Sequence, residues 1–349
     1  MKLLSDCKFV GELNATAIGS LPHPCSYEAL QLINKYLKSL PFWPQLPRRS
    51  ELEHMIIQFI EPLPGLRFEG ESPVLCLSEG MQEAKQLYRA YIDGETLHNP
   101  QKERAAGLYD FASRSWSQAF AVKGHMTGPI TLGLSIKDEQ DKPILYSDQA
   151  MDILTVMLSL SAAWQEQFLR DELGAETIIF LDEPGLASLG SAFSPYPQQK
   201  AQRWMTKVLE GLKGVSGVHC CGSGDWEMLL SLDVDIISFD AHQYGEQFCA
   251  HGRKVGQFLA GGGLVAWGMV PTDKRVHQIT EDDLVEMFLH HADELTERVQ
   301  GLDINTLALK SLLTPACGLG ASDIKVAERA ISLNSSVSRK LKREIFGSG

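Results

Sequence analysis

Short runs of apolar or β-branched residues recur along the chain, and most of them are separated by stretches with helical periodicity. The run TIIFL at 177–181 is apolar on both faces, as expected of a strand buried under helices. Strands that alternate with helices predict an α/β fold with a parallel sheet. The candidate strands are residues 16–19, 42–45, 119–123, 177–181, 217–220, 236–239, 264–266 and 307–312.

Two long helices are predicted in the last quarter of the chain. In 282–299 the residues Leu284, Phe288, His291 and Leu295 fall near one helical face. A second helix is expected over 323–341, with Ser322 as its N-cap. Both helices would cover the sheet.

Eight strands can form either a doubly wound sheet or a closed barrel. A doubly wound sheet usually places a glycine-rich phosphate loop after its first strand. Here the first turn reads IGSLPHP, and the GGG at 261–263 precedes a strand instead of following one. We therefore expect one (β/α)8 TIM-barrel domain over 1–349, with 62–99 as a decorating insertion and 345–349 as a flexible tail.

The composition of the chain argues against two classes of binding partner. The formal net charge of −12 argues against a nucleic-acid partner and against docking to an anionic membrane. The start, MKLLSDCKF, has no apolar core of a signal peptide, and the longest apolar stretch, from Met151, is interrupted. The seven cysteines include the adjacent pair Cys220 and Cys221, which suits a reduced cytoplasm with some thiols bound to metal.

Metal-ligating residue types gather where predicted strands end, which is where such barrels place their active sites. In VHCCGSGDW, His219 and Cys221 are two residues apart and can point the same way at a strand end. Asp240 ends the next strand, and Cys317 follows the last one. Together these four residues would make a tetrahedral zinc shell.

Simpler interpretations stay open for each residue alone. An isolated HxC is a weak metal signal, Cys317 could be a small buried apolar residue, and Asp240 could cap the following helix. Cys220 should face the wall, because strand side chains alternate. In IIFLDEPGL, Asp182 is predicted to pair with a substrate ammonium and Glu183 to support it, while the alternative is a helix cap or an internal salt bridge.

The ordered set IGSLP, GPITL, LDEP, HxC, DIISFD and PACGL resembles the catalytic barrel of the cobalamin-independent methionine synthases. It resembles more loosely the zinc methyltransferases that use methylcobalamin, within the uroporphyrinogen decarboxylase-like superfamily. The similarity runs from about Ala17 to the last helix. HxC with a later PxCGL is its specific part.

The resemblance implies roles at matching positions. It makes His219, Cys221 and Cys317 zinc ligands, with Asp240 at the place of a glutamate ligand in that family. It further implies that a group of residues binds homocysteine: Ile18, Gly19, Ser20, Glu51 and Asp182. Asp182 and Asp240 would have the catalytic roles, by orienting the substrate and by yielding a metal position to the thiol. Other strand-end side chains would support the site from behind: Glu183, His125 and Trp267.

One departure bears on the methyl donor. The methionine synthases place a histidine after the seventh strand, whereas the corresponding AWGMVPTD has none. A folate nitrogen leaves poorly without a proton, whereas a corrinoid cobalt needs none. We therefore expect zinc-dependent methylation of homocysteine to methionine, with methylcobalamin or a corrinoid protein as donor and partner.

Other functions remain open at this stage. They are a folate-dependent methionine synthase-like enzyme, a methylcobalamin:coenzyme M-type methyltransferase, a metal-free uroporphyrinogen-type decarboxylase, and a zinc- or corrinoid-binding protein without turnover. The decarboxylase would need clustered arginines for substrate carboxylates, and the strand ends here carry few.

Overall fold

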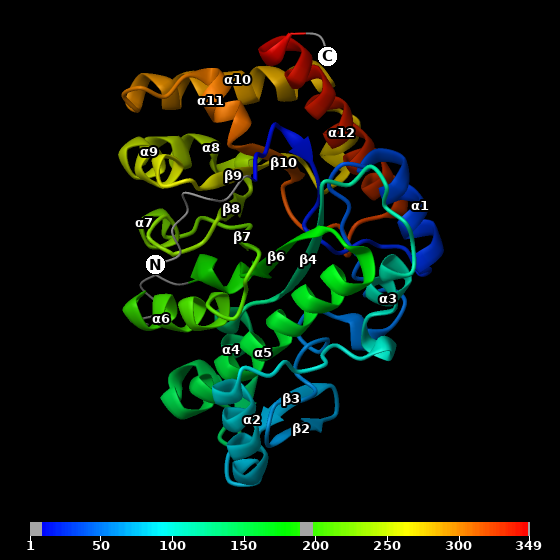
Figure 1. The fold of residues 1–349 in the computed structure, drawn as a ribbon, viewed down its shortest axis with the longest axis vertical. Coiled ribbons are helices and arrows are strands. Elements are labelled where there is room, and N and C mark those ends of the chain that lie inside the picture. Colours follow the sequence, from blue (N-terminus) through cyan, green and yellow to red (C-terminus); the bar gives the residue numbers. More distant parts are fainter. Residues whose placement is uncertain (1–8, 189–197, 348–349) are drawn as a thin grey trace.

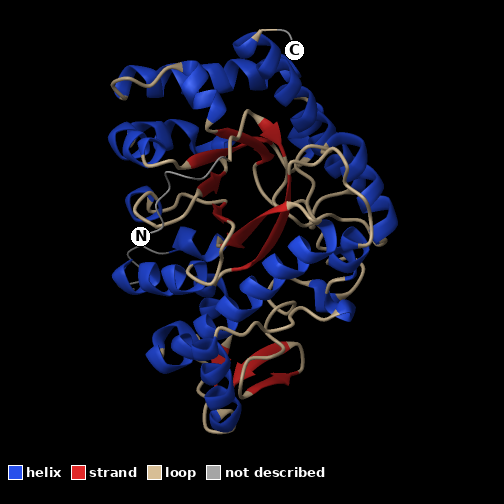
Figure 2. Ribbon diagram, viewed as in Figure 1, coloured by secondary structure: helices blue, strands red, loops and turns tan. Residues whose placement is uncertain are grey.

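The computed structural model describes residues 9–188 and 198–347. Its main feature is a seven-stranded parallel sheet that curls around a common centre, with helices on its outer side (Figures 1 and 2). The strand order is β1-β10-β9-β8-β7-β6-β4. The bounds are β1 Asn14–Ala15, β4 Ala121–Thr127, β6 Glu176–Asp182, β7 Val215–Cys220, β8 Ile236–Phe239, β9 Leu264–Val270 and β10 Ser311–Pro315. The predicted α/β fold with a parallel sheet is confirmed.

The segment 42–45 contributes isolated bridges instead of a ladder. Ser20 bridges Gln45, and Phe42 bridges Lys123, both in parallel orientation. This places the segment between the β1 side of the sheet and β4. Pro41 and Pro44 flank or interrupt the segment and have no N–H to donate, which explains why no regular strand forms there.

Helices follow most strands and cover the outer side of the sheet. The sheet residues are buried nearly throughout, as the apolar runs predicted. The longer helices are α1 Ser26–Tyr36, α3 Ala106–Ala112, α4 Pro129–Ser135, α5 Asp148–Leu173, α6 Gln198–Leu209, α8 Ala241–Ala250, α9 Gly252–Ala260, α10 Glu281–Arg298 and α12 Ile324–Phe346.

A small second sheet lies apart from the main one, at the lower end of the molecule in Figure 1. It pairs β2 (Leu66–Glu69), β3 (Ser72–Leu75) and β5 (Lys137–Asp138), next to α2 (Met81–Asp93). The segment predicted as a decoration, 62–99, contains β2, β3 and α2, while β5 comes from later in the chain.

Several element boundaries differ from the sequence prediction. Residues 307–309 belong to α11 (Ile304–Leu309), and β10 begins at Ser311. The N-cap of α12 is Asp323, because the Ser322 hydroxyl instead donates to the Thr272 carbonyl. The predicted tail begins inside α12, which continues to Phe346, while 348–349 and the first eight residues lie outside the described part.

Within residues 9–188 and 198–347, no helix is long and apolar enough to cross a bilayer.

Candidate metal centre

His219, Cys221 and Cys317 come together at the carboxyl-terminal edge of the main sheet. One ligand atom from each lies within 4.8 Å of the others. His219 is near the end of β7, Cys221 follows that strand, and Cys317 follows β10. Because parallel strands end at the same edge, residues almost a hundred positions apart can meet there.

The adjacent residues Cys220 and Cys221 point to opposite sides of the sheet, because side chains alternate along a strand. Cys220 is fully buried in the apolar core, whereas Cys221 is partly accessible beside His219. Burial raises the pKa of the Cys220 thiol to about 12, so this thiol stays protonated. Cys220 therefore belongs to the wall of the sheet, as its position predicted.

Ser238 fixes the orientation of the His219 ring. The two residues are register partners on β7 and β8, and the Ser238 hydroxyl lies 3.0 Å from His219 Nδ1. His219 is 2% exposed, and its Nε2 has no hydrogen-bond partner among the described residues. A buried ring with one nitrogen held and the other free is the arrangement of a metal-ligating histidine.

The two thiols of the group share a hydrogen bond. That bond lowers the pKa of Cys221 well below its usual value, with a further contribution from His219. The same hydrogen bond, together with burial, raises the pKa of Cys317. The lowered pKa of Cys221 favours its thiolate, which is the form that binds zinc.

The loop that carries Cys317 packs directly on Ser20. The Ser20 hydroxyl accepts a hydrogen bond from Gly320 N at 3.1 Å, and the Ser20 carbonyl accepts one from Leu319 N at 3.0 Å. A Cβ on Gly318 would lie 2.4 Å from Ser20 Oγ, so a larger residue there would displace the Ser20 hydroxyl. The structure thus brings the predicted thiol-binding segment, Ile18 to Ser20, next to a predicted metal ligand.

Asp182, which is half-buried, and the buried Lys123 interact electrostatically near this segment. Burial raises the pKa of Asp182 to about 6, although the charges of Lys123 and His219 oppose the shift. Burial lowers the pKa of Lys123 to about 8, and the Lys123 ammonium donates to the Ile18 carbonyl at 2.5 Å. Within the described chain, Asp182 Oδ1 is buried without a partner. This oxygen is therefore available to a cationic group.

His125 lies under the same segment. Its ring stacks on Trp43 with centroids 4.0 Å apart, and a Cβ on Gly19 would lie 2.4 Å from it. Neither ring nitrogen finds a partner in the part of the chain that the structure describes. Burial holds the pKa of His125 well below its usual value, so the ring is neutral.

Asp240 caps α8. Its Oδ1 accepts from Gln243 N at 2.9 Å and its Oδ2 from Gln243 Nε2 at 2.5 Å. This is the capping role that the sequence left open. Asp240 is buried near Cys221, and its carboxylate lies outside the group of ligand atoms that lie within 4.8 Å of one another.

The remaining predicted residues lie at different distances from the metal group. The Glu183 carboxylate is fully buried and accepts hydrogen bonds from Ile130 N and from the amide and hydroxyl of Thr131, which anchors the start of α4. Glu51 is exposed in a short 3-10 turn. Trp267 lies inside β9, three residues before its end, and its indole donates to the Ser311 hydroxyl.

Three residues at the site were not predicted from the sequence. Ser238 could be found only from the register, since it lies nineteen residues after His219 on the paired strand. Lys123 gave a signal, because it is a single charge within an otherwise uncharged strand. His242 hydrogen-bonds to the Met269 backbone and so brings an imidazole to the carboxyl-terminal end of β9.

The donor set fits zinc. One imidazole nitrogen without a hydrogen-bond partner and two thiols are borderline and soft ligands of the kind zinc prefers, and three protein ligands leave a fourth position open.

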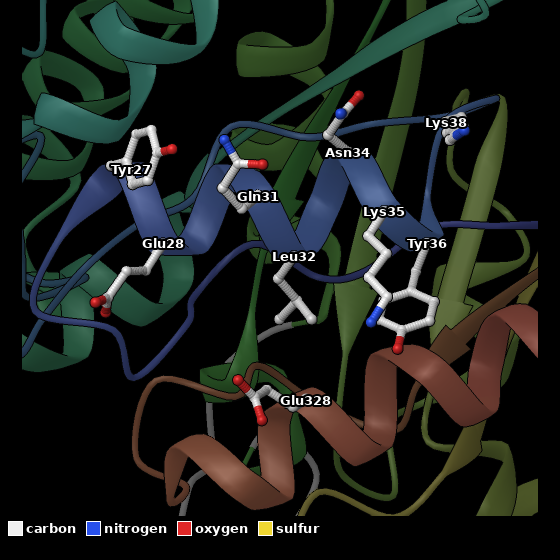
Figure 3. A pocket seen from close by; sticks show the side chains of 9 residues that line it. All are labelled: Tyr27, Glu28, Gln31, Leu32, Asn34, Lys35, Tyr36, Lys38 and Glu328. Carbon is white, nitrogen blue, oxygen red and sulfur yellow. The ribbon is translucent and has the colours of Figure 1, made fainter.

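A separate surface hollow of about 650 Å³ lies along α1, between this helix and α12 (Figure 3). It is lined by Tyr27, Glu28, Gln31, Leu32, Asn34, Lys35, Tyr36, Lys38 and Glu328. None of these is a residue of the metal group.

No protein-family model and no curated protein matches this sequence. Solved structures do match. A B12-independent methionine synthase from Shewanella sp. W3-18-1, in complex with selenomethionine, has a TM-score of 0.61 and 15% identity, covering 96% of this chain and 99% of the other. A protein described as a vitamin-B12-independent methionine synthase from Listeria monocytogenes has a TM-score of 0.60 and 15% identity, covering 98% of this chain and 100% of the other. At this identity the likeness establishes the shared fold.

Proposed function

We propose that this protein is a zinc-dependent S-methyltransferase that methylates the thiol of homocysteine. One observation carries the proposal: an imidazole and two thiols lie together, and the loop that carries one of the thiols is hydrogen-bonded to Ser20 of the predicted substrate-binding segment. The fold shared with methionine synthases supports the same conclusion. We further propose that residues 42–45 complete an eight-strand barrel and that the chain is one domain.

In this proposal His219, Cys221 and Cys317 hold the zinc ion. Bound zinc would lower the pKa of the substrate thiol and present it as an oriented thiolate. Ser238 holds His219 in the tautomer with Nε2 free, and the Cys317 loop is fixed to Ser20.

Asp182 is the proposed partner of the substrate ammonium. Its free Oδ1 is buried, so an ion pair there would be poorly screened and worth more than one at the surface. Lys123 and the Ile18 carbonyl fix the neighbouring backbone, and the Ser20 hydroxyl still has a proton to donate to a carboxylate.

Asp240 is proposed as an additional ligand that reaches the metal only by exchanging its contacts with Gln243. Its two oxygens are both used in the cap, so this exchange has a cost. A weakly held carboxylate is suited to yield its position when the thiol enters.

A methyl-corrinoid is the proposed donor, because the segment AWGMVPTD itself has no histidine to protonate a folate nitrogen. Methyltetrahydrofolate is the second candidate, and one observation favours it. His242 of α8 hydrogen-bonds to Met269, so an imidazole does lie beside this segment, although burial lowers its pKa and its capacity to hold a proton at pH 7.

The test combines metal analysis with a methyl-transfer assay. The purified chain should contain zinc and convert homocysteine to methionine with methylcobalamin faster than with methyltetrahydrofolate. Cys221→Ser and Cys317→Ser should each lose zinc and activity, while Cys220→Ala, which changes a wall residue, should keep both. Turnover by a zinc-free chain would refute the proposal, and turnover with the folate alone would reverse the donor assignment.

A further inference from the structure

A second cluster of metal-ligating side chains lies between the outer helices α8 and α10. Cys249 comes from α8, and His291 and Glu294 come from successive turns of α10. One ligand atom of each lies within 4.8 Å of the others. Cys249 and His291 are buried, and Glu294 is half-buried. None of the three belongs to the centre described above.

The His291 ring is held with one nitrogen free. A hydrogen bond joins the ring to the Ala241 backbone, while Nδ1 is buried and makes no hydrogen bond to any described residue. The bond to Ala241 is therefore made by Nε2, which leaves the lone pair on Nδ1. A Cβ on Gly245 would lie 2.1 Å from Nε2, so the glycine lets the ring approach α8. A second nitrogen held by a carbonyl is typical of metal-ligating histidine.

Glu294 is oriented in a similar way. Its Oε1 accepts a hydrogen bond from Arg298 at 3.1 Å, and its Oε2 is buried without a partner within the described chain. A buried carboxylate oxygen with no donor is costly unless a cation compensates it.

Cys249 completes the group. Its side chain is fully buried, and Sγ lies 3.6 Å from the His291 carbonyl. Burial raises the pKa of this thiol to about 12, so it is protonated when no cation is bound. A divalent cation would displace that proton to solvent, and the resulting thiolate and the Glu294 carboxylate would balance its two charges.

We propose that Cys249, His291 and Glu294 form a second site for a divalent metal ion of borderline softness, with zinc as the best match. Sulfur, imidazole nitrogen and carboxylate oxygen are the three ligand types of protein zinc sites. In a tetrahedral site with bonds of about 2.0–2.3 Å, neighbouring ligand atoms lie roughly 3.4–3.8 Å apart. Small rotations of Cys249 and Glu294 would bring the group to that spacing.

The site would join α10 to α8, the helix that Asp240 caps. Helix α8 begins directly after Asp240, and Ala241, which holds His291, is its first residue. A metal bound here would fix α8 against α10 and so fix the position of Asp240. With three protein ligands, a water molecule would take the fourth position.

Zinc binding in a chain that lacks the first centre tests this proposal. In the Cys221→Ser/Cys317→Ser double variant, titration with zinc chloride should still give one bound ion per chain, against two in the unchanged protein. Adding Glu294→Gln should weaken that remaining binding about ten-fold or more. Adding Arg298→Gln instead removes the Glu294–Arg298 ion pair but keeps the Glu294 ligand, so this variant should still bind zinc.

Cobalt(II) gives an independent readout of the sulfur ligand. In the double variant, cobalt chloride should produce thiolate-to-cobalt charge-transfer absorption in the near ultraviolet. Cys249→Ala should abolish it, whereas Cys76→Ala, at a buried cysteine outside both groups, should not. Two results would overturn the second site. One is a double variant that binds no zinc, and the other is a double variant whose zinc binding and cobalt absorption survive Glu294→Gln and Cys249→Ala. Either result would leave the proposed function standing.

Discussion

His219 and Ser238 face each other across β7 and β8, with the Ser238 hydroxyl 3.0 Å from His219 Nδ1. The contact engages Nδ1, Nε2 has no hydrogen-bond partner among the described residues, and one nitrogen of the ring lies within 4.8 Å of the thiols of Cys221 and Cys317. The metal affinity of the site should therefore depend on a residue that does not touch the metal.

Ser238→Ala removes that contact and frees the His219 ring to rotate or change tautomer. We expect zinc affinity to fall about 10–100-fold, because partners of ligating histidines commonly contribute this much. Competition with a chromogenic chelator measures it. Ser216→Ala is the matched control, since it removes a buried hydroxyl of the neighbouring strand β7 that contacts Asp235 instead of His219. Equal zinc affinity in the two variants would contradict the orienting role.

Asp240→Asn keeps a helix N-cap, because asparagine caps as well as aspartate, but it removes a negative ligand. We expect zinc affinity to fall about ten-fold while the thermal midpoint of unfolding stays unchanged. Gln243→Ala does the opposite, since it releases Asp240 Oδ2 and keeps its charge. Its zinc affinity should be equal or higher. If Asp240→Asn leaves zinc affinity unchanged, Asp240 acts only as a cap.

Asp182→Asn keeps the shape of the side chain and removes its charge. The kcat/KM for homocysteine should fall roughly 10–100-fold, the range of a hydrogen bond to a charged group. With 4-mercaptobutyrate, which has the same thiol and carboxylate but no ammonium, the variant should match the unchanged protein. A similar loss of kcat/KM with both thiols would show that Asp182 supports the site structurally and does not bind the ammonium.

The parts of this site that follow from strand ends could be predicted, and those that depend on packing could not. His219, Cys221 and Cys317 were found because the carboxyl ends of parallel strands share one edge. Ser238 was missed because its contact depends on the register between two strands, which no local pattern encodes.

The second cluster was missed for a different reason. His291 falls on the same helical face as Leu284, Phe288 and Leu295, where periodicity alone marks a core residue. Only the approach of α8 to α10 shows that Cys249 and Glu294 lie beside it. The segment 42–45 forms isolated bridges instead of the predicted regular strand, because its aromatic residues suit a sheet while Pro44 and the preceding Pro41 do not.

Glu183 should make the stability of the fold depend on pH. Burial raises the pKa of Glu183 to about 7 in the folded protein, from an ordinary value near 4.5. The folded state therefore binds a proton that the unfolded state releases between these values. The stabilisation that this proton gives to the folded state is complete below about pH 4.5 and is lost as pH rises through 7.

Glu183→Gln removes this titration and keeps the size of the side chain. Acidification from pH 8 to pH 5.5 should raise the free energy of unfolding of the unchanged protein relative to the variant, by on the order of 1–3 kcal/mol. Urea unfolding at both pH values, with the same saturating zinc, measures the difference. Both proteins share all other titrating groups, so the subtraction isolates Glu183. A difference that stays constant between the two pH values would mean that the hydrogen bonds from Ile130 and Thr131 keep this carboxylate ionised throughout.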